Sequence, residues 1–363
     1  MTKSICSNSY AIPFFGILSL TLLGVLFIYN KPSNPYPENW IAGWKFANAF
    51  QEPRRALAAV AANGYIYVIG GMNARGNYVT TVEYAKINPD GSLGSWQLTS
   101  ALNEGRFYLA AVNVDNFIFA LGGGSGPAGD GNYPVATVER AAIQPDGSLS
   151  NWVILGYMQT PRRGLKAIAY DHRIYAIGGY SGIFLKSTEH TVVDKQGNPG
   201  KWQIDPQLAT LDRYIHSASI YRGIIYLLGG HVQRSDKMSY GDVETSTIDQ
   251  STGYLQPWTI EKSRLTMPRF IASAFTLNGR LYISGGHSGA SRLNHVEFAS
   301  IDRGGHVGAW RPTTALNIPR SAAATAVSGD FVYVLGGMGN QQTLNSVEYA
   351  TAAGNGHLGH VSQ

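Results

Sequence analysis

The stretch Arg-Arg-Ala-Leu-Ala-Ala-Val-Ala-Ala-Asn-Gly-Tyr-Ile-Tyr-Val-Ile-Gly-Gly, residues 54–71, contains the pattern that decides the fold. It opens with arginine, continues through small apolar residues to Asn63-Gly64, and then runs through an apolar segment to Gly70-Gly71. Asn-Gly tolerates the positive φ angles of a tight turn between two antiparallel strands. These residues therefore predict a β-hairpin.

The same pattern occurs six times along the chain. An arginine stands sixteen residues before each Gly-Gly pair, at Arg54, Arg106, Arg162, Arg213, Arg269 and Arg320, and the pairs start at Gly70, Gly122, Gly178, Gly229, Gly285 and Gly336. A variable loop and a glutamate follow, at Glu83, Glu139, Glu189, Glu244, Glu297 and Glu348, and then a turn and a tryptophan, at Trp96, Trp152, Trp202, Trp258 and Trp310. A period of 51–56 residues built of four short strands is typical of a propeller blade.

The missing sixth tryptophan is found at the other end of the repeats. Trp44 lies ten residues before Arg54, as Trp96 lies ten before Arg106, whereas Val361 occupies the tryptophan position at the C-terminal end. We therefore expect strand 42–48 to pair with strand 345–351 and to complete blade six. Residues 42–363 would then form a closed ring without an open seam.

The series of arginine, apolar strand, Gly-Gly, glutamate and tryptophan resembles the kelch repeat, and the resemblance covers residues 42–353. It implies an all-β fold of the galactose oxidase-like superfamily, a six-bladed β-propeller with four-stranded blades around a central channel. Many kelch proteins are protein-interaction modules and a few are enzymes, so the fold does not define the chemistry.

Residues 11–29 are nineteen consecutive uncharged residues, which predict one N-terminal transmembrane signal-anchor helix. We expect residues 1–10 to form a short cytoplasmic tail, residues 30–41 a Pro-rich stalk, and the propeller to lie outside, in the periplasm or the extracellular space. The alternative is a cleaved signal peptide and a secreted propeller, although no small-x-small cleavage site follows the apolar run. The absence of an Asn-x-Ser/Thr site favours a bacterial source.

The arginines and glutamates occur once in every repeat, so we expect them to form a structural ion pair in each blade rather than a catalytic ring. We also expect the first strand of each blade to line the channel. The fifth residue after each arginine is small, as required where six strands converge: Ala59, Ala111, Ala167, Ala218, Ala274 and Thr325.

Functional residues are expected where the repeats differ. The loops after Gly-Gly vary most and share one face with the loops before the arginines in kelch topology. They supply the candidate binding residues Arg75, Tyr78, Asp130, Tyr133, Tyr180, His231, Arg234, Tyr240, His287 and Arg292. Near the channel, Lys166 replaces Ala or Ser, and His216 replaces Leu or Ala. A buried lysine needs a partner or a shifted pKa.

The sequence contains no nucleophile–base motif, phosphate loop or dense Lys/Arg run, so we expect no catalytic residue, cofactor or nucleic-acid partner. His231 and His287 alone are too few for a metal site, and the single cysteine, Cys6, excludes the Tyr–Cys crosslink of a copper radical oxidase. We therefore favour a membrane-anchored extracytoplasmic binding module for a protein or glycan partner. The alternative is a sugar-binding or sugar-processing propeller similar to a sialic acid mutarotase.

Overall fold

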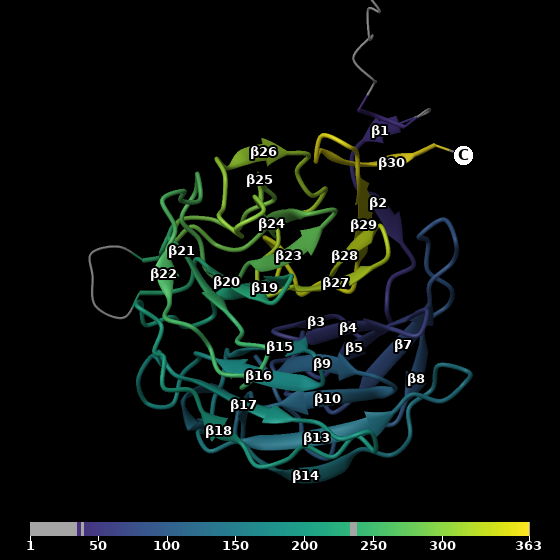
Figure 1. Cartoon of the computed structure of the whole chain (residues 1–363). Helices are drawn as coiled ribbons and strands as arrows, with labels where there is room; N and C mark the ends of the chain where they lie inside the picture. Colours follow the sequence, from purple (N-terminus) through teal and green to yellow (C-terminus); the bar gives the residue numbers. More distant parts are fainter. Residues whose placement is uncertain (1–34, 38–39, 233–237, 363) are drawn as a thin grey trace, which may run out of the picture. The chain divides into compact units, whose positions relative to one another are not determined.

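Six antiparallel sheets surround a common centre in the part of the chain that the computed structural model describes, residues 35–37, 40–232 and 238–362 (Figure 1). Five sheets contain four strands each, which follow one another in chain order, and the sixth sheet is a composite of both ends of this part. The predicted six-bladed β-propeller with four-stranded blades is therefore confirmed.

The first three blades each start with their innermost strand. Blade one consists of β4 (Ala58–Ala62), β5 (Tyr65–Ile69), β7 (Val82–Lys86) and β8 (Gln97–Thr99). Blade two consists of β9 (Ala110–Val114), β10 (Phe117–Leu121), β13 (Thr137–Ala142) and β14 (Val153–Tyr157). Blade three consists of β15 (Lys166–Tyr170), β16 (Arg173–Ile177), β17 (Thr188–Val192) and β18 (Gln203–Ile204).

The remaining blades repeat this order. Blade four consists of β19 (Ser217–Tyr221), β20 (Ile224–Leu228), β21 (Val243–Thr247) and β22 (Thr259–Ile260). Blade five consists of β23 (Ser273–Leu277), β24 (Arg280–Ser284), β25 (Val296–Ser300) and β26 (Arg311–Thr313). Blade six starts with β27 (Ala324–Ser328), β28 (Phe331–Leu335) and β29 (Val347–Ala352).

Blade six is completed by strands from both ends of the described chain. β2 (Lys45–Ala47) pairs with β29 at Val347–Tyr349, and β30 (Leu358–Val361) pairs with β29 at Thr351–Ala352. A further strand, β1 (Trp40–Ala42), pairs with β30. The stalk expected over 30–41 therefore overlaps this strand, which begins at Trp40. A strand of three residues directly after a Pro-rich stretch has no sequence pattern that would predict it.

The first strand of each blade lines the channel. β4, β9, β15, β19, β23 and β27 contact one another in this order, and β27 contacts β4, which closes the ring around the centre (Figure 1). All six small residues at the fifth position after the arginines line an axial cavity of about 130 Å³. Their expected position at the channel is thereby confirmed.

The turn between the first two strands of each blade contains a residue in the left-handed conformation. φ is +50° at Asn63, +51° at Asp115, +47° at Asp171, +50° at Arg222, +48° at Asn278 and +55° at Gly329. Asn, Asp and Gly adopt this conformation at the lowest cost among the amino acids, which explains the hairpin signals in the sequence.

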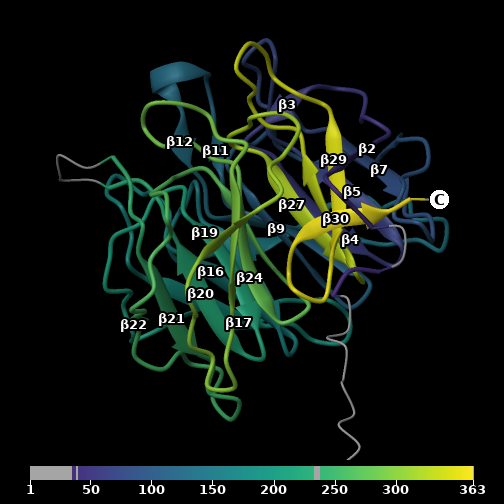
Figure 2. The same cartoon turned by 90° about the horizontal axis from the view of Figure 1, so that it is seen from above.

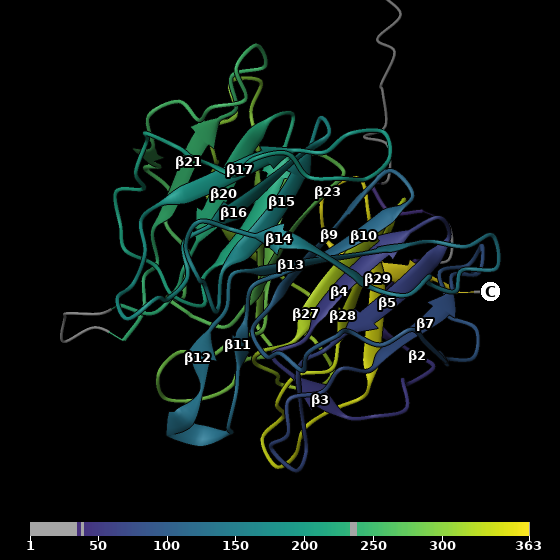
Figure 3. The same cartoon turned by 90° about the horizontal axis from the view of Figure 1, so that it is seen from below.

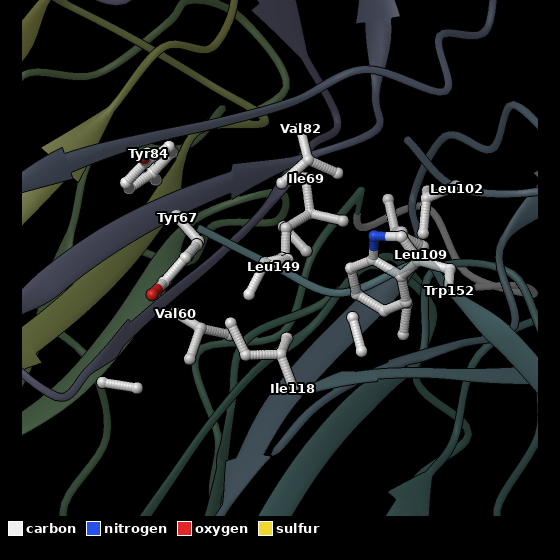
Figure 4. Packing of buried hydrophobic residues seen from close by; sticks show 14 residues of the cluster. Val60, Tyr67, Ile69, Val82, Tyr84, Leu102, Leu109, Ile118, Leu149 and Trp152 are labelled. Carbon is white, nitrogen blue, oxygen red and sulfur yellow. The ribbon is translucent and has the colours of Figure 1, made fainter. Parts of the chain in front are cut away.

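The apolar core lies between neighbouring blades. Trp152 of blade two packs with Leu109 of its own blade and with Val60 and Tyr67 of blade one in one cluster of buried residues (Figure 4). Trp44 packs against blade five residues such as Phe275 and so takes the role of the missing tryptophan.

Buried tyrosines connect successive blades. Five tyrosine hydroxyls on the second strands donate 2.8 Å hydrogen bonds to glycine carbonyls in a turn of the next blade: Tyr67 to Gly147, Tyr175 to Gly253, Tyr226 to Gly305, Tyr282 to Gly356 and Tyr333 to Gly91. Blade two has Phe119 at this position. The Tyr333 bond joins blade six to blade one and so bridges the closing seam.

The N-terminal predictions concern residues that lie mostly outside the described part. The expected tail, the expected membrane helix over 11–29 and residues 30–34 are not among the described residues. Within 35–37, 40–232 and 238–362, no helix has the length and apolar character needed to cross a bilayer.

Candidate functional site

Each blade buries one arginine–glutamate ion pair. The pairs are Arg54–Glu83 (2.6 Å), Arg106–Glu139 (2.5 Å), Arg162–Glu189 (2.9 Å), Arg213–Glu244 (3.0 Å), Arg269–Glu297 (2.8 Å) and Arg320–Glu348 (2.6 Å). Each arginine also donates to the carbonyl of the first glycine of its Gly-Gly pair. Burial lowers the pKa of these arginines, and the paired glutamate acts against this shift. The predicted structural role is confirmed, because no ligand can reach these side chains.

The residue after each buried arginine points to a different environment. It forms a short β-bridge with the residue after the Gly-Gly pair of its own blade: Arg55 with Met72, Phe107 with Gly124, Arg163 with Tyr180, Tyr214 with His231, Phe270 with His287, and Ser321 with Met338. Blades three to five are the blades that place two large side chains, at least one of them aromatic, at the bridge. We call Arg163, Tyr180, Tyr214, His231, Phe270 and His287 the rim.

The loops that carry these bridges lie on one face of the propeller. β3 (Arg54–Arg55) pairs with β6 (Met72–Asn73), and the blade-two loop adds β11 (Gly124–Ser125), η1 (Gly129–Gly131) and β12 (Tyr133–Pro134). β3, β11 and β12 extend from the same side in two views (Figures 2 and 3). The expected shared loop face is therefore present.

Aromatic side chains of the rim, together with Phe184 of the blade-three loop, form a continuous series of contacts. Ring centroids are 5.2 Å apart for Phe184 and Tyr214, 5.7 Å for Phe184 and His231, 5.2 Å for His231 and Phe270, and 5.4 Å for Phe270 and His287. Such separations are typical of favourable aromatic pairs. All five rings are partly accessible to solvent, so the series is both packed and available to a partner.

Arg163 is the cationic member of the rim. Its guanidinium carbon lies 4.7 Å from the Tyr180 ring centre and 5.9 Å from that of Tyr214, and Nη1 donates to the Asn132 side-chain oxygen. Its buried Nε has no hydrogen-bond partner within the described structure. The cation–π contacts hold the guanidinium in place while leaving donor capacity unused.

A ring of backbone hydrogen bonds lies beside the rim. Each blade contributes one residue with positive φ, namely Ala56, Tyr108, Gly164, Ile215, Ile271 and Ala322. Five bonds of 2.7–2.9 Å connect the N–H of one such residue to the carbonyl of the preceding one. In the described structure the bond from Ile215 N–H to the Gly164 carbonyl is not formed. These six residues line a small cavity of about 30 Å³, which we call the channel mouth.

Lys166 is the one charged residue among those that line the two described channel cavities. Burial lowers its pKa to about 8. The structure shows no hydrogen bond or ion pair for its ammonium group within the described residues. At the equivalent positions Ser217 and Ser273 donate to the carbonyls of Ala272 and Ala323 in the next blade, so Lys166 departs from the repeat in both charge and bonding.

His216 lies between blades rather than in the channel. It is 1% exposed, and it packs against Gly178 of blade three and Gly230 of its own blade. Burial, Lys166 and Arg213 all lower its pKa, and neither ring nitrogen has a hydrogen-bond partner among the described residues. His216 is not among the residues that line the two described channel cavities, and its side chain packs between blades three and four at a position where the other blades have leucine or alanine.

The candidates from blades one and two are dispersed over the loop face. Arg75, Asp130 and Tyr133 are exposed, and Asp130 lies in η1. Tyr78 instead stacks on Phe107 with ring centres 4.4 Å apart. These side chains are not part of the rim.

The candidates from blades four and five have mixed roles. Tyr240 donates a 2.8 Å hydrogen bond to Asp212, and Arg292 forms a β-bridge with His287, whose pKa is lowered by burial and by Arg292. His231 Nδ1 lies 2.6 Å from the Met238 carbonyl, and the described residues contain no group of three or more His, Cys, Asp or Glu suited to a metal ion. Arg234 lies outside the described residues.

Sequence reasoning identified Tyr180, His231 and His287 but missed the other half of the rim. Arg163, Tyr214 and Phe270 each directly follow a repeated arginine. In the six blades this position is Arg, Phe, Arg, Tyr, Phe and Ser, whereas the preceding position is always arginine. That contrast was a usable signal for the rim.

Comparison with known proteins agrees with the fold and the repeats. The Kelch motif matches residues 53–84. The chain is 23% identical to kelch repeat and BTB domain-containing protein 1 of Cowpox virus (strain Brighton Red), over 70% of this chain and 42% of that protein. It is 25% identical to alpha-scruin of Limulus polyphemus, over 67% of this chain and 26% of that protein. These matches support a kelch-repeat protein.

A solved structure described as the structure of YjhT superimposes with a TM-score of 0.66. The superposition covers 84% of this chain and 97% of that one at 14% sequence identity. This similarity concerns the fold alone. The chain spans about two fifths of the length of the viral relatives that it matches.

Proposed function

We propose that this chain is a protein-interaction module that binds its partner with the rim. The observation that carries the proposal is the continuous series of accessible aromatic rings in blades three to five, with Arg163 stacked on Tyr180. Aromatic residues and arginine dominate the binding energy of protein interfaces, and loops on a rigid scaffold present them without a large ordering cost. The matches to kelch-repeat proteins support the same class of function.

Site-specific photo-crosslinking in the source cell tests the proposal. We would place benzoylphenylalanine at Phe270 of the full chain, and at Leu98 on the outer strand of blade one as the matched control, since Leu98 is 59% exposed. We expect a discrete crosslinked partner from position 270, none from position 98, and loss of the product when Tyr214→Ala is added. Crosslinking from position 98 alone would place the interface on the outer strands and contradict the proposal.

The chemical nature of the partner is read from the same product. A protein partner adds foreign peptides to the tryptic digest of the crosslinked band, as mass spectrometry shows, whereas a glycan partner makes the band sensitive to periodate. Nothing among the described residues singles out a sugar-processing reaction.

We also propose that residues 11–29 anchor the chain in a bacterial membrane, with the N-terminus in the cytoplasm and the propeller outside. The nineteen uncharged residues support this proposal. The full chain should resist extraction with alkaline carbonate, and protease added outside the cytoplasm should degrade the propeller. A mature N-terminus located after residue 29 would instead establish the cleaved signal peptide and a secreted protein.

A further inference from the structure

A groove of about 270 Å³ lies on the outer side of the propeller, between blades two and three. Blade two contributes residues 155–157 of β14, its outermost strand, together with Gln159, and blade three contributes residues 199–202. None of the six rim residues lines this groove. Binding in the groove is therefore independent of the function proposed for the rim.

The indole N–H of Trp202 is an unused hydrogen-bond donor in this groove. Trp202 is 5% exposed and lines the groove, and its Nε1 has no hydrogen-bond partner within the described structure. The unbonded Nε1 atoms of Trp258 and Trp310 are enclosed by protein, whereas that of Trp202 reaches solvent. This donor can therefore be satisfied only from the groove, by water or by an acceptor of a ligand.

A local break in the repeat explains why this donor is free. The tryptophans of three other blades donate to a carbonyl four residues after the tryptophan of the preceding blade: Trp44 to Thr314, Trp96 to Asn48 and Trp152 to Ser100. The corresponding residue for Trp202 is Gly156. Gly156 has a φ of +126° and follows Leu155, a bulged residue without a cross-strand partner in β13. Between blades two and three, no equivalent bond is found in the described structure.

The chemistry of the groove favours an occupant that accepts hydrogen bonds without donating them. The Trp202 indole and the Lys201 ammonium are donors only, and no carboxylate lines the groove. The side-chain N–H of Gln159 already donates to the Trp202 carbonyl, at 2.6 Å. Tyr157, which is 67% exposed, and Pro199 add apolar surface. An occupant with free carbonyls and apolar rings complements this lining.

We infer that this groove is the docking site for a proline-rich segment of a partner protein in the polyproline II conformation. Such a segment has no internal hydrogen bonds, so its carbonyls are free to accept, and proline has no N–H that the groove would have to satisfy. Aromatic-lined grooves are a recurrent way to bind such segments. A β-strand fits less well, because the bulge at Leu155 interrupts the ladder that an added strand would extend.

Fluorine NMR of the full chain in mild detergent, labelled with 5-fluorotryptophan, tests the inference. The chain has seven tryptophans, and Trp202→Phe, which keeps an aromatic ring in the core, identifies the resonance of Trp202. The probes are decaproline, an alternating Thr-Val peptide with lysine at both ends, chitohexaose, and a Gly-Ser peptide as a flexible control. Tyr157→Ala removes an exposed ring of the groove, and Leu98→Ala is the matched control, since Leu98 is 59% exposed on the outer strand of blade one.

We expect decaproline to shift the Trp202 resonance saturably and the Gly-Ser peptide to leave it in place. The Kd for decaproline should be at least about fivefold higher in Tyr157→Ala than in the wild type or Leu98→Ala. Equal Tm values for these three proteins exclude misfolding as the cause. A Trp202 resonance that does not respond to decaproline, or an unchanged Kd in Tyr157→Ala, would overturn the inference. A response to the Thr-Val peptide or to chitohexaose at a lower concentration than to decaproline would overturn the choice of occupant.

Discussion

Arg162 and Arg163 are neighbours in the sequence, but they occupy opposite kinds of environment. The Arg162 side chain is 0% exposed, its Nε donates to Glu189 at 2.9 Å, and its Nη1 donates to the Gly178 carbonyl at 2.9 Å. Arg163 stacks on the ring of Tyr180 at the surface and forms no ion pair among the described residues.

The difference between these two arginines shows how a repeat can keep one position constant and let the next position vary. The position of Arg162 is arginine in all six blades, and in each blade this arginine forms a buried ion pair with a glutamate. The next position changes from blade to blade and faces the loop side. Each blade therefore keeps one residue for stability and leaves its neighbour open to vary, and the two can be tested separately.

The largest effect is expected from breaking a buried pair. Glu189→Ala leaves the Arg162 guanidinium buried and unpaired, so the free energy of unfolding should fall by about 3–5 kcal/mol in urea titrations. The double variant Arg162→Met, Glu189→Leu removes both charges and should recover much of this loss. A double variant as unstable as Glu189→Ala would show that geometry, rather than the unpaired charge, is responsible.

A smaller effect with a distinct pH dependence is expected at Lys166. Burial lowers the pKa of Lys166 in the folded state to about 8, from the usual lysine value of 10.5, so the unfolded chain binds the proton more tightly. Stability of the wild type relative to Lys166→Ala should therefore be lowest below pH 8 and rise between pH 8 and 10.5. Since Lys166 is only partly buried, solvent screening reduces the penalty, and we expect Lys166→Ala to be more stable by about 1–2 kcal/mol at pH 7. Urea midpoints at pH 7, 9 and 10 measure this, and a pH-independent difference would contradict it.

The bonds between blades give a pair of opposite substitutions. Tyr333→Phe removes the bond to the Gly91 carbonyl and should lower the free energy of unfolding by about 1 kcal/mol. Phe119→Tyr introduces a hydroxyl where blade two lacks one and should raise it by about 0.5–1 kcal/mol. Thermal unfolding of both variants is the measurement, and a destabilising Phe119→Tyr would show that the Gly197 carbonyl of the next blade is out of reach.

The smallest effect on stability is expected at the rim. Arg163→Ala loses cation–π contacts at a partly exposed site, so unfolding should change by about 0.5–1 kcal/mol only. Crosslinking from position 270 should nevertheless be lost. A destabilisation as large as that of Glu189→Ala would mean that Arg163 is structural, and the contrast with Arg162 would fail.

The fold could be predicted from the sequence because its signals are repeated and local. Arg54, Gly70 and Glu83 recur at nearly constant spacing in six copies, so an error in one blade does not affect the assignment of the others. The strand at 42–48 could be placed because Trp44 keeps its distance from Arg54.

The rest depends on contacts that local patterns do not contain. β1 and β30 pair with each other from opposite ends of the described chain, and three- and four-residue strands have no period of their own. The place of His216 between blades could not be predicted because this residue lies just before β19, outside the strand alternation that the sequence pattern gives. Half of the rim was missed because variation beside an invariant arginine looks unremarkable in a single blade.

The composite sixth blade also has a consequence for the order of events on the ribosome. β2 pairs with β29, and about 300 residues separate the two strands. At about 5–20 residues per second, the N-terminal strand waits on the order of 15–60 s for its partner to be synthesised. During that interval Phe46 and Ile41 are presented without their sheet, while blades one to five can assemble from residues close in sequence. The ring can therefore close only after the last few dozen residues have been synthesised, and until then the exposed N-terminal strands can bind chaperones.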